Sequence, residues 1–264
     1  MPATIPSHQA AVLGFKLWKP HRFDGMALVV GAAAPDAAYV VTGLGFEVPG
    51  HAWHALLWFN LPVTLVLAAL IRRSAPHVVA HLPNGGWLAL ADYAVLASVR
   101  HPLRVTAYSA LVGAASHLLW DSITHPYLLI AHPFLGPDTY LPALHATAFA
   151  GLPWWRVIHL FSELLGALIT LAAALHVGRR RLLVSWHGPA PVVPARPAVF
   201  WPVTAAAFAA LVAASLALPA NHLLHVIAAR VLGALLIATL LAAAAAAAAS
   251  RWAEPLIPGG PLSR

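Results

Sequence analysis

A polar stripe interrupts one of the most apolar stretches of this chain. The segment SHLLWDSITH, residues 116–125, carries His117, Asp121 and His125 at intervals of four residues. Because an α-helix turns about 100° per residue, these three side chains fall within about 80° of one another on one helix face. Ionisable groups are costly to bury unless they are paired or bind an ion. The spacing therefore predicts a metal-binding or catalytic stripe, and the alternative is a set of hydrogen bonds that packs helices together.

A second pair of ionisable residues with the same spacing lies further along the chain. His159 and Glu163 open another apolar segment, and a helix places them on one face. Imidazole nitrogen and carboxylate oxygen suit zinc, with manganese and iron as alternatives, and helical bundles hold metals with such groups from several helices. We therefore expect a metal centre that several helices share. The candidate ligands are His8, Asp36, His51, His54, His117, Asp121, His125, His159 and Glu163.

Three of these candidates depend on how the chain folds. His51 and His54 open the same apolar segment, and the sequence does not decide between them. His8 reaches the level of Asp36 if residues 8–18 form a half-length helix antiparallel to the segment that carries Asp36. In that arrangement all the candidates converge in one half of the bilayer.

The composition is that of a membrane protein. Of the 264 residues, 61% are hydrophobic and 9% are charged, whereas soluble domains carry about 25% charged residues. The chain contains no cysteine, which excludes disulfides, thiolate metal sites and cysteine nucleophiles.

The fold class that follows is all-α, a polytopic transmembrane helical bundle of about six spans. Each predicted span has about the 20 residues that a bilayer requires. The first is the weakest, because it contains Pro35 and Asp36. The predicted spans are residues 25–46, 52–71, 104–131, 156–177, 199–219 and 222–249.

Positive charge indicates the orientation of these spans. With six crossings, all of the 15 basic residues except Arg156 and Arg230 lie on one side of the membrane, which is the cytoplasmic side by the positive-inside rule. Both termini are then cytoplasmic, and the candidate ligands lie toward the outer half. The net charge of +7 is therefore a topology signal, and we expect no nucleic-acid partner.

The chain is expected to divide into three parts. Residues 1–181 form a helical membrane domain that holds the metal site, residues 182–198 are a proline-rich cytoplasmic linker, and residues 199–264 contribute two C-terminal transmembrane helices without candidate ligands.

Two resemblances bear on the function. The His-x-x-x-Asp pair of one helix and the His-x-x-x-Glu pair of a later helix resemble the zinc-dependent phospholipase C and P1 nuclease family. The segments TIPSHQA, APD and SHLLWDSITH resemble bacterial multi-pass proteins of unknown function, commonly described as predicted membrane-bound metal-dependent hydrolases. The resemblance covers about residues 1–177 and implies a location in the bacterial inner membrane, with a phospholipase C-like helical core in the first four spans.

The resemblance also implies roles for individual residues. His117 and Asp121 match a ligand pair whose aspartate bridges two metals. His159 and Glu163 match a pair on a further metal, with His125 beside them. The implied cofactor is zinc, one to three ions.

Together these features predict an integral membrane hydrolase that acts through a metal-activated water. A bound metal lowers the pKa of its water from about 15.7 to about 7. Asp121 is expected to bridge the ions and Asp36 to orient or deprotonate the attacking water. A site in the outer half of the membrane suits a phospholipid or another lipid-linked phosphodiester.

Two other classes of function remain open at this point. A transporter would use intramembrane ionisable groups as an ion path, and a structural membrane protein would use them to lock helices. The segments LVLAAL and ALITLAAAL in the inner halves of spans 52–71 and 156–177 contain no ionisable group, which favours the enzyme. The sequence leaves the oligomeric state open.

Overall fold

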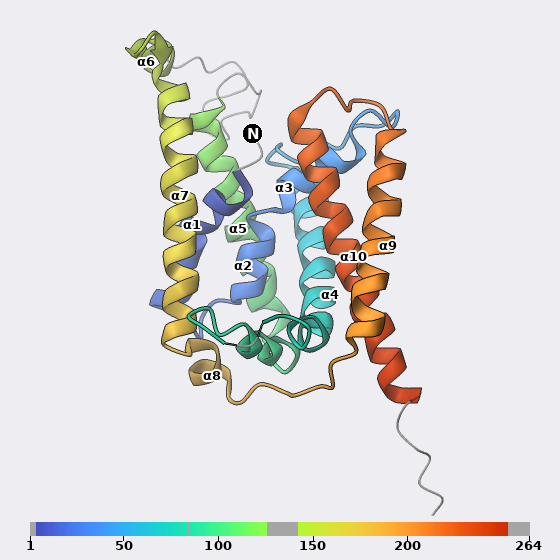
Figure 1. Ribbon diagram of the computed structural model, residues 1–264. Coiled ribbons are helices and arrows are strands. Elements are labelled where there is room, and N and C mark those ends of the chain that lie inside the picture. Colours follow the sequence, from blue (N-terminus) through green and yellow to red (C-terminus); the bar gives the residue numbers. More distant parts are fainter. Residues whose placement is uncertain (1–3, 84, 126–141, 253–264) are drawn as a thin grey trace, which may run out of the picture.

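The computed structural model describes residues 4–83, 85–125 and 142–252, which form a bundle of helices (Figure 1). The N-terminal helices are α1 (Thr4–Trp18), α2 (Gly25–Gly31), α3 (Ala34–Ala37) and the 3₁₀ helix η1 (Ala38–Val41). The next elements are the π-helix η2 (Leu56–Asn60), α4 (Leu61–Val79), the 3₁₀ helix η3 (Leu90–Ala97) and α5 (Leu103–Thr124). After the gap come α6 (Pro142–His145), α7 (Trp154–Arg179), α8 (Leu182–His187), α9 (Pro197–Leu216) and α10 (Leu224–Trp252).

Four of the described helices are long and apolar enough to cross a membrane. They are the continuous helix Leu56–Val79 together with α7, α9 and α10. These correspond to the spans predicted at 52–71, 156–177, 199–219 and 222–249. α5 covers the described part of the span predicted at 104–131, and residues 126–131 lie outside the described residues. α5 is not among the four, since Ser, Thr, His and Asp side chains break its apolar sequence.

The segment predicted as a span over residues 25–46 is not one continuous helix. α2 ends at Gly31 after seven residues, and the chain resumes as α3 and then as a 3₁₀ turn. Pro35 lies in the first turn of α3, where its missing N–H costs nothing, but it cannot continue a helix that arrives from α2. The break places Asp36 in a short helix inside the bundle.

The half-length helix predicted for residues 8–18 is present as α1. α1 packs on α7, α2 packs on α5 and α4, and η3 and α8 lie at one end of the bundle (Figure 1). α9 and α10 pack on each other, and α10 also packs on α4.

Glycines bring α2 and α5 into close contact. A Cβ atom added at Gly31 would lie 2.4 Å from the carbonyl oxygen of Ala110, and one added at Gly113 would lie 2.4 Å from that of Leu28. Small residues allow helix backbones to approach closely in this way. This contact fixes the position of His117, Asp121 and His125 along the bundle axis relative to α3.

Asp24 ties three helices together at the end of the bundle near η3. It caps α2 by accepting from the N–H of Ala27, accepts from the hydroxyl of Thr106 on α5, and pairs with Arg72 of α4. Burial alone would raise the pKa of Asp24, but the hydrogen bonds and charge of Arg72 hold that pKa below its usual range.

Arg230 of α10 makes a second buried clamp. It donates to the carbonyl oxygens of Val40 at 3.2 Å and Thr42 at 2.8 Å, and to the carbonyl oxygen of Pro219 and Oδ1 of Asn221, each at 2.7 Å. Arg230, one of the two arginines that the orientation rule left unexplained, therefore holds the segment after α3 against α10.

The expected all-α class needs one small correction. A hairpin of β1 (Thr147–Phe149) and β2 (Leu152–Pro153) precedes α7. Ala150 and Gly151 between the strands both have positive φ, 51° and 75°, as a tight two-residue hairpin loop requires.

Candidate metal centre

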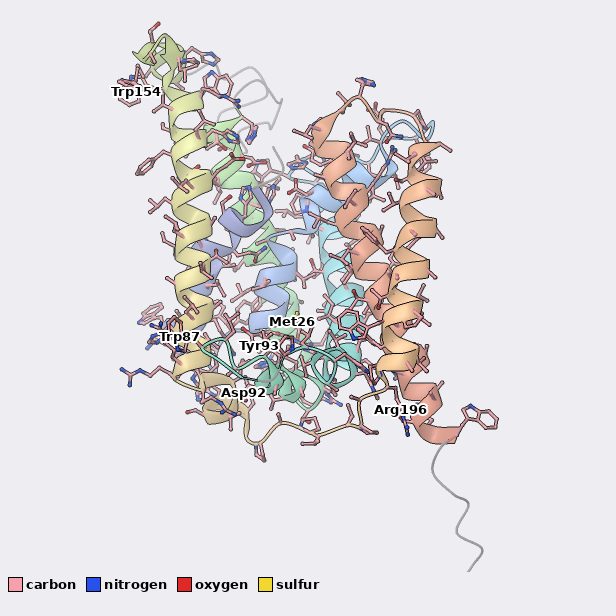
Figure 2. All side chains as sticks on the ribbon, viewed as in Figure 1. Met26, Trp87, Asp92, Tyr93, Trp154 and Arg196 are labelled. Atoms are coloured by element: carbon pink, nitrogen blue, oxygen red, sulfur yellow. The ribbon has the colours of Figure 1, made fainter. Side chains whose placement is uncertain are left out.

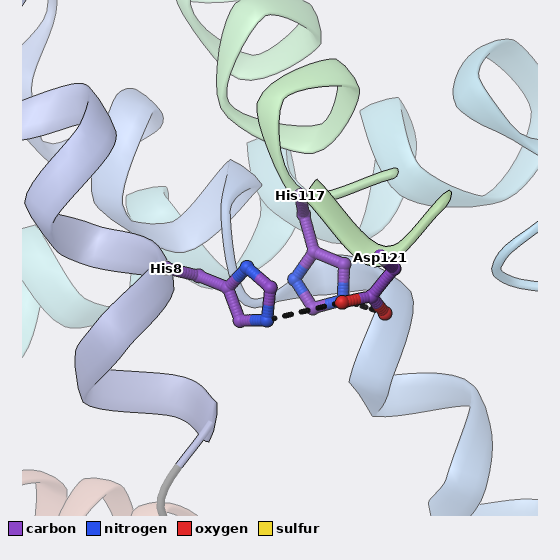
Figure 3. Close-up of side chains that lie close together, drawn as sticks. All are labelled: His8, His117 and Asp121. Atoms are coloured by element: carbon purple, nitrogen blue, oxygen red, sulfur yellow. Dashed lines mark ion pairs between the residues drawn. The ribbon is translucent and has the colours of Figure 1, made fainter. Parts of the chain in front are cut away.

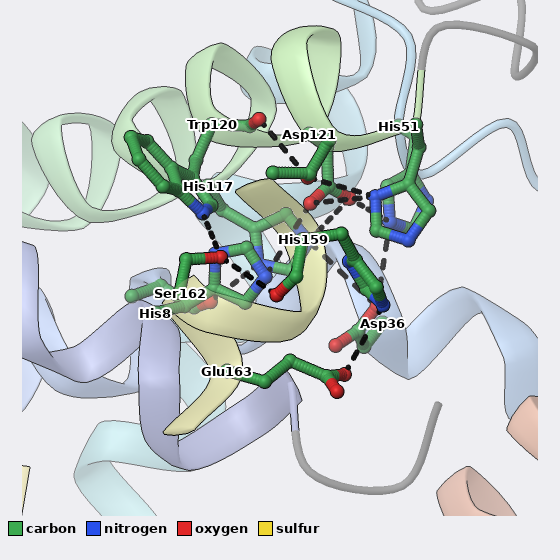
Figure 4. A network of polar contacts seen from close by, with 12 residues as sticks. His8, Asp36, His51, His117, Trp120, Asp121, His159, Ser162 and Glu163 are labelled. Carbon is green, nitrogen blue, oxygen red and sulfur yellow. Dashed lines mark hydrogen bonds and ion pairs between the residues drawn. The ribbon is translucent and has the colours of Figure 1, made fainter. Parts of the chain in front are cut away.

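Two histidines and two aspartates from three parts of the fold, α3, the turn before η2, and α5, face one another. Nε2 of His51 lies 3.3 Å from Oδ1 of Asp36 and 3.6 Å from Oδ2 of Asp121. Nε2 of His117 lies 3.7 Å and 3.2 Å from the same two oxygens (Figure 4). Ligand atoms around a tetrahedral ion with bonds of about 2.0–2.2 Å are about 3.3–3.6 Å apart. These four separations fit ligands that share an ion, and the ligand atoms of two overlapping trios, Asp36–His51–His117 and His8–His117–Asp121, lie within 4.8 Å of one another.

The other oxygen of Asp121 faces a second pair of histidines. Oδ1 of Asp121 lies 3.4 Å from Nε2 of His8 and 3.4 Å from Nδ1 of His125. The ring of His8 stacks on that of His117 with centroids 3.8 Å apart (Figure 3). Asp121 thus has one oxygen toward each pair, as a carboxylate that bridges two ions would.

Several atoms of this cluster are buried without a hydrogen-bond partner. They are Nε2 of His51, Nε2 of His117 and Oδ1 of Asp121. His117 donates from Nδ1 to the carbonyl oxygen of Ala32 at 2.8 Å, so in the neutral ring Nε2 presents a lone pair. Lone pairs and carboxylate oxygens that face one another repel unless a proton or a cation lies between them. The hydrogen bond to Ala32 orients His117 as the outer partners of metal-bound histidines do.

His159 and Glu163 adjoin this cluster without facing Asp121. Nε2 of His159 lies 3.4 Å from Oε1 of Glu163, and that oxygen is buried without a hydrogen-bond partner. The His159 ring meets the ring of His125 edge-on, with centroids 4.6 Å apart. The pair therefore extends the cluster onto α7, through His125.

Of the two histidines that the sequence left undecided, the structure brings only His51 into the cluster. His54 is exposed and its ring stacks on Trp58. The two residues lie in a turn before η2, where a step of three residues points the side chains to different sides. His54 is therefore removed from the candidate ligands.

Gly50 and Asn60 position His51. A Cβ at Gly50 would lie 2.6 Å from the carbonyl oxygen of Pro35 and 2.7 Å from Cβ of Ala38, so only glycine allows the turn to pack on α3. The buried Asn60 donates to the carbonyl oxygen of Gly50 at 3.0 Å and holds the turn in place. This packing is what brings His51 to Asp36.

Sequence reasoning missed two contributors to the cluster. Tyr39 lies three residues after Asp36, and its ring is 5.0 Å from that of His51 and 4.7 Å from that of His225. Its position three residues after Asp36 was the feature of the sequence that could have identified Tyr39 as a neighbour of the cluster. The carbonyl of Ala32 carries no signal in the sequence, since it faces His117 only because the helix breaks there.

Comparisons with known proteins give one match. A family model described as "Domain of unknown function (DUF4184)" matches residues 1–250. No curated protein and no solved structure matches the chain. The family match agrees with the expected membership of a family of unknown function. Nothing in these comparisons supports the resemblance to the phospholipase C and P1 nuclease family.

Proposed function

We propose that this chain, which belongs to the DUF4184 family, is an integral membrane metal-dependent hydrolase that acts on phosphodiester or phospholipid-like substrates. The observation that carries the proposal is the group of Asp36, His51, His117 and Asp121, in which Nε2 of each histidine lies 3.2–3.7 Å from an oxygen of each aspartate. Two carboxylates and two imidazoles suit zinc first, and manganese or iron as alternatives. The charge of the two aspartates would be balanced by one divalent ion.

Each residue has a role in the proposed reaction. Divalent ions in such sites acidify a water molecule and neutralise charge on a phosphoryl group. Asp121, whose side chain is 5% exposed, is the anchoring ligand that both pairs of histidines share. With His51, His117 and Asp121 as the three ligands, Asp36, which is more accessible at 14%, would orient the attacking water and take its proton. On this proposal the His-x-x-x-Asp and His-x-x-x-Glu pairs act as they do in the phospholipase C and P1 nuclease family.

The proposed setting is the bacterial inner membrane. The proposal includes six crossings with a phospholipase C-like core in the first four, cytoplasmic termini and the centre toward the outer half. The four long apolar helices support membrane insertion. η3 and α8 lie at one end of the bundle (Figure 1), and Arg100 follows η3 and Arg179, Arg180 and Arg181 precede α8 in the sequence, which supports that end as cytoplasmic. A lipid-linked phosphodiester is the substrate that such a position suits.

The distribution of charge favours an enzyme over an ion path. Between Glu163 and His176, α7 carries no ionisable residue, and between Asn60 and Arg72 the same holds for α4. An ion path would need polar groups through both halves of the bundle. Because the candidate ligands lie in one half of the bundle, their distribution supports a catalytic site rather than an ion path.

Elemental analysis of purified protein tests the metal. Wild type is compared with His51→Asn and with the matched control His54→Asn, which alters an exposed histidine three residues away. We expect near-stoichiometric zinc, manganese or iron in wild type and His54→Asn, and at least tenfold less in His51→Asn. Absence of metal from wild type after loading with all three ions would refute the centre.

A hydrolysis assay tests the reaction separately. Metal-loaded wild type in lipid nanodiscs is expected to cleave a fluorescent phospholipid or a lipid-linked phosphodiester. Asp36→Asn is expected to lose this activity by at least 100-fold. A protein that binds metal but leaves every phosphodiester intact would refute the hydrolase. Metal-free protein that instead carries ions across vesicles would establish the transporter.

A further inference from the structure

A cavity of about 250 Å³ lies between α1 and α7, and none of the candidate metal ligands lines it. Gln9, Leu13 and Leu17 line it from one face of α1, and Ala173 and Ala174 line it from α7. The two alanines leave space where larger side chains would fill the contact between the helices. The cavity lies toward the end of the bundle near η3, as the lining residues Met26 and Tyr93 show in Figure 2.

The charged residues of this cavity leave one positive charge unbalanced. Lys16, Arg72 and Asp24 line it, and Arg72 pairs with Asp24. Lys16 donates to the carbonyl oxygens of Pro20 and Phe23 and lies 5.2 Å over the ring of Trp186. The carbonyls satisfy hydrogen bonds of Lys16 but do not neutralise its charge.

Two polar atoms of the lining residues are buried without a hydrogen-bond partner. Nε of Arg72 is a donor without an acceptor, and Oε1 of Gln9 is an acceptor without a donor. Gln9 is 7% exposed, so bulk water does not satisfy it. An unpaired buried polar group costs about 1–3 kcal/mol. Two residues that line the cavity therefore carry unsatisfied polar atoms, Arg72 beside the cationic end and Gln9 further along α1.

We propose that this cavity binds a single-chain anionic amphiphile. Its carboxylate or phosphate lies beside the positive charges of Arg72 and Lys16. Its hydrocarbon chain follows the leucine and alanine walls toward Gln9, seven residues and about 10 Å away along α1. Typical ligand pockets have volumes of about 300–1,000 Å³, so this cavity holds one chain and not two. The site is independent of the metal centre.

Equilibrium binding to protein in phosphatidylcholine nanodiscs tests the proposal. The probes are radiolabelled laurate, dodecyl phosphate and dodecylamine, with empty nanodiscs subtracted. We expect saturable binding of about one laurate or dodecyl phosphate per protein, and at least tenfold weaker binding of dodecylamine. Whichever of laurate and dodecyl phosphate binds with the higher affinity identifies the preferred head group. Equal binding of dodecylamine would overturn the proposal.

A matched pair of variants locates the bound chain. Ala174→Phe fills the cavity, whereas Ala172→Phe makes the same change at an exposed position of α7. We expect at least a tenfold loss of laurate affinity in Ala174→Phe and less than a twofold change in Ala172→Phe. Equal affinities in the two variants would overturn the proposed site. The comparison of probes uses wild type alone, so it decides the question even if Ala174→Phe does not fold.

Discussion

Replacing Asp121 by asparagine distinguishes between two interpretations of the cluster, a metal centre and a network of hydrogen bonds. Asp121 lies 3.2–3.6 Å from the nearest nitrogens of four histidines, and asparagine keeps its shape but removes its charge. Loss of an outer partner of a ligand costs about 10–100-fold in metal affinity. Because Asp121 is itself the shared ligand, we expect a loss of at least about 100-fold, which is about 2.8 kcal/mol.

The expected effect on thermal unfolding follows from this loss. Zinc at 100 times its Kd stabilises the wild type by about 2.7 kcal/mol. At about 2–4 °C per kcal/mol for a chain of this size, zinc raises the Tm by about 5–11 °C. In Asp121→Asn the same zinc concentration is at most equal to Kd, which gives about 0.4 kcal/mol and a rise of about 1–2 °C.

The assay is differential scanning fluorimetry of chelator-treated protein in nanodiscs, with and without zinc. Asp92→Asn is the matched control, since Asp92 is a buried aspartate that pairs with Arg181, away from the cluster. It is expected to lower the Tm of the metal-free protein and to keep the full rise with zinc. A full rise with zinc in Asp121→Asn, or none in wild type, would refute the reasoning.

Three further predictions concern residues that hold the helices and turns of the bundle together. Gly50→Ala forces a Cβ to within 2.6 Å of a carbonyl oxygen of the α3 segment, so zinc affinity should fall at least tenfold by titration, and unchanged affinity would contradict the packing argument. Arg230→Met leaves four buried acceptors without their donor and should destabilise the fold by about 3 kcal/mol, measured as a drop in Tm of about 6–12 °C. Because the pKa of Asp24 is lowered from 3.8 in the folded state, its stabilisation is complete well above that pH and is lost as the pH falls through the folded pKa. The Tm difference between wild type and Asp24→Asn should therefore narrow below about pH 3.8, and a widening there would contradict the ion pair.

The sequence by itself determined the features that depend on one segment at a time. The alignment of His117, Asp121 and His125 follows from the helical period, since backbone hydrogen bonds within one segment set that geometry. The pairing of His159 with Glu163 follows in the same way. Four of the apolar spans were likewise readable from length and hydropathy, which are properties of the local sequence.

Only the tertiary structure decided which segments meet. The choice of His51 over His54 depends on the turn at Gly50, which packs on a helix that the sequence alone did not show to be broken. His8 reaches Asp121 because α1 lies inside the bundle, and Arg230 clamps carbonyls about 190 residues earlier in the chain. Such contacts depend on the close packing of distant backbones, and no periodicity within a single segment encodes that packing.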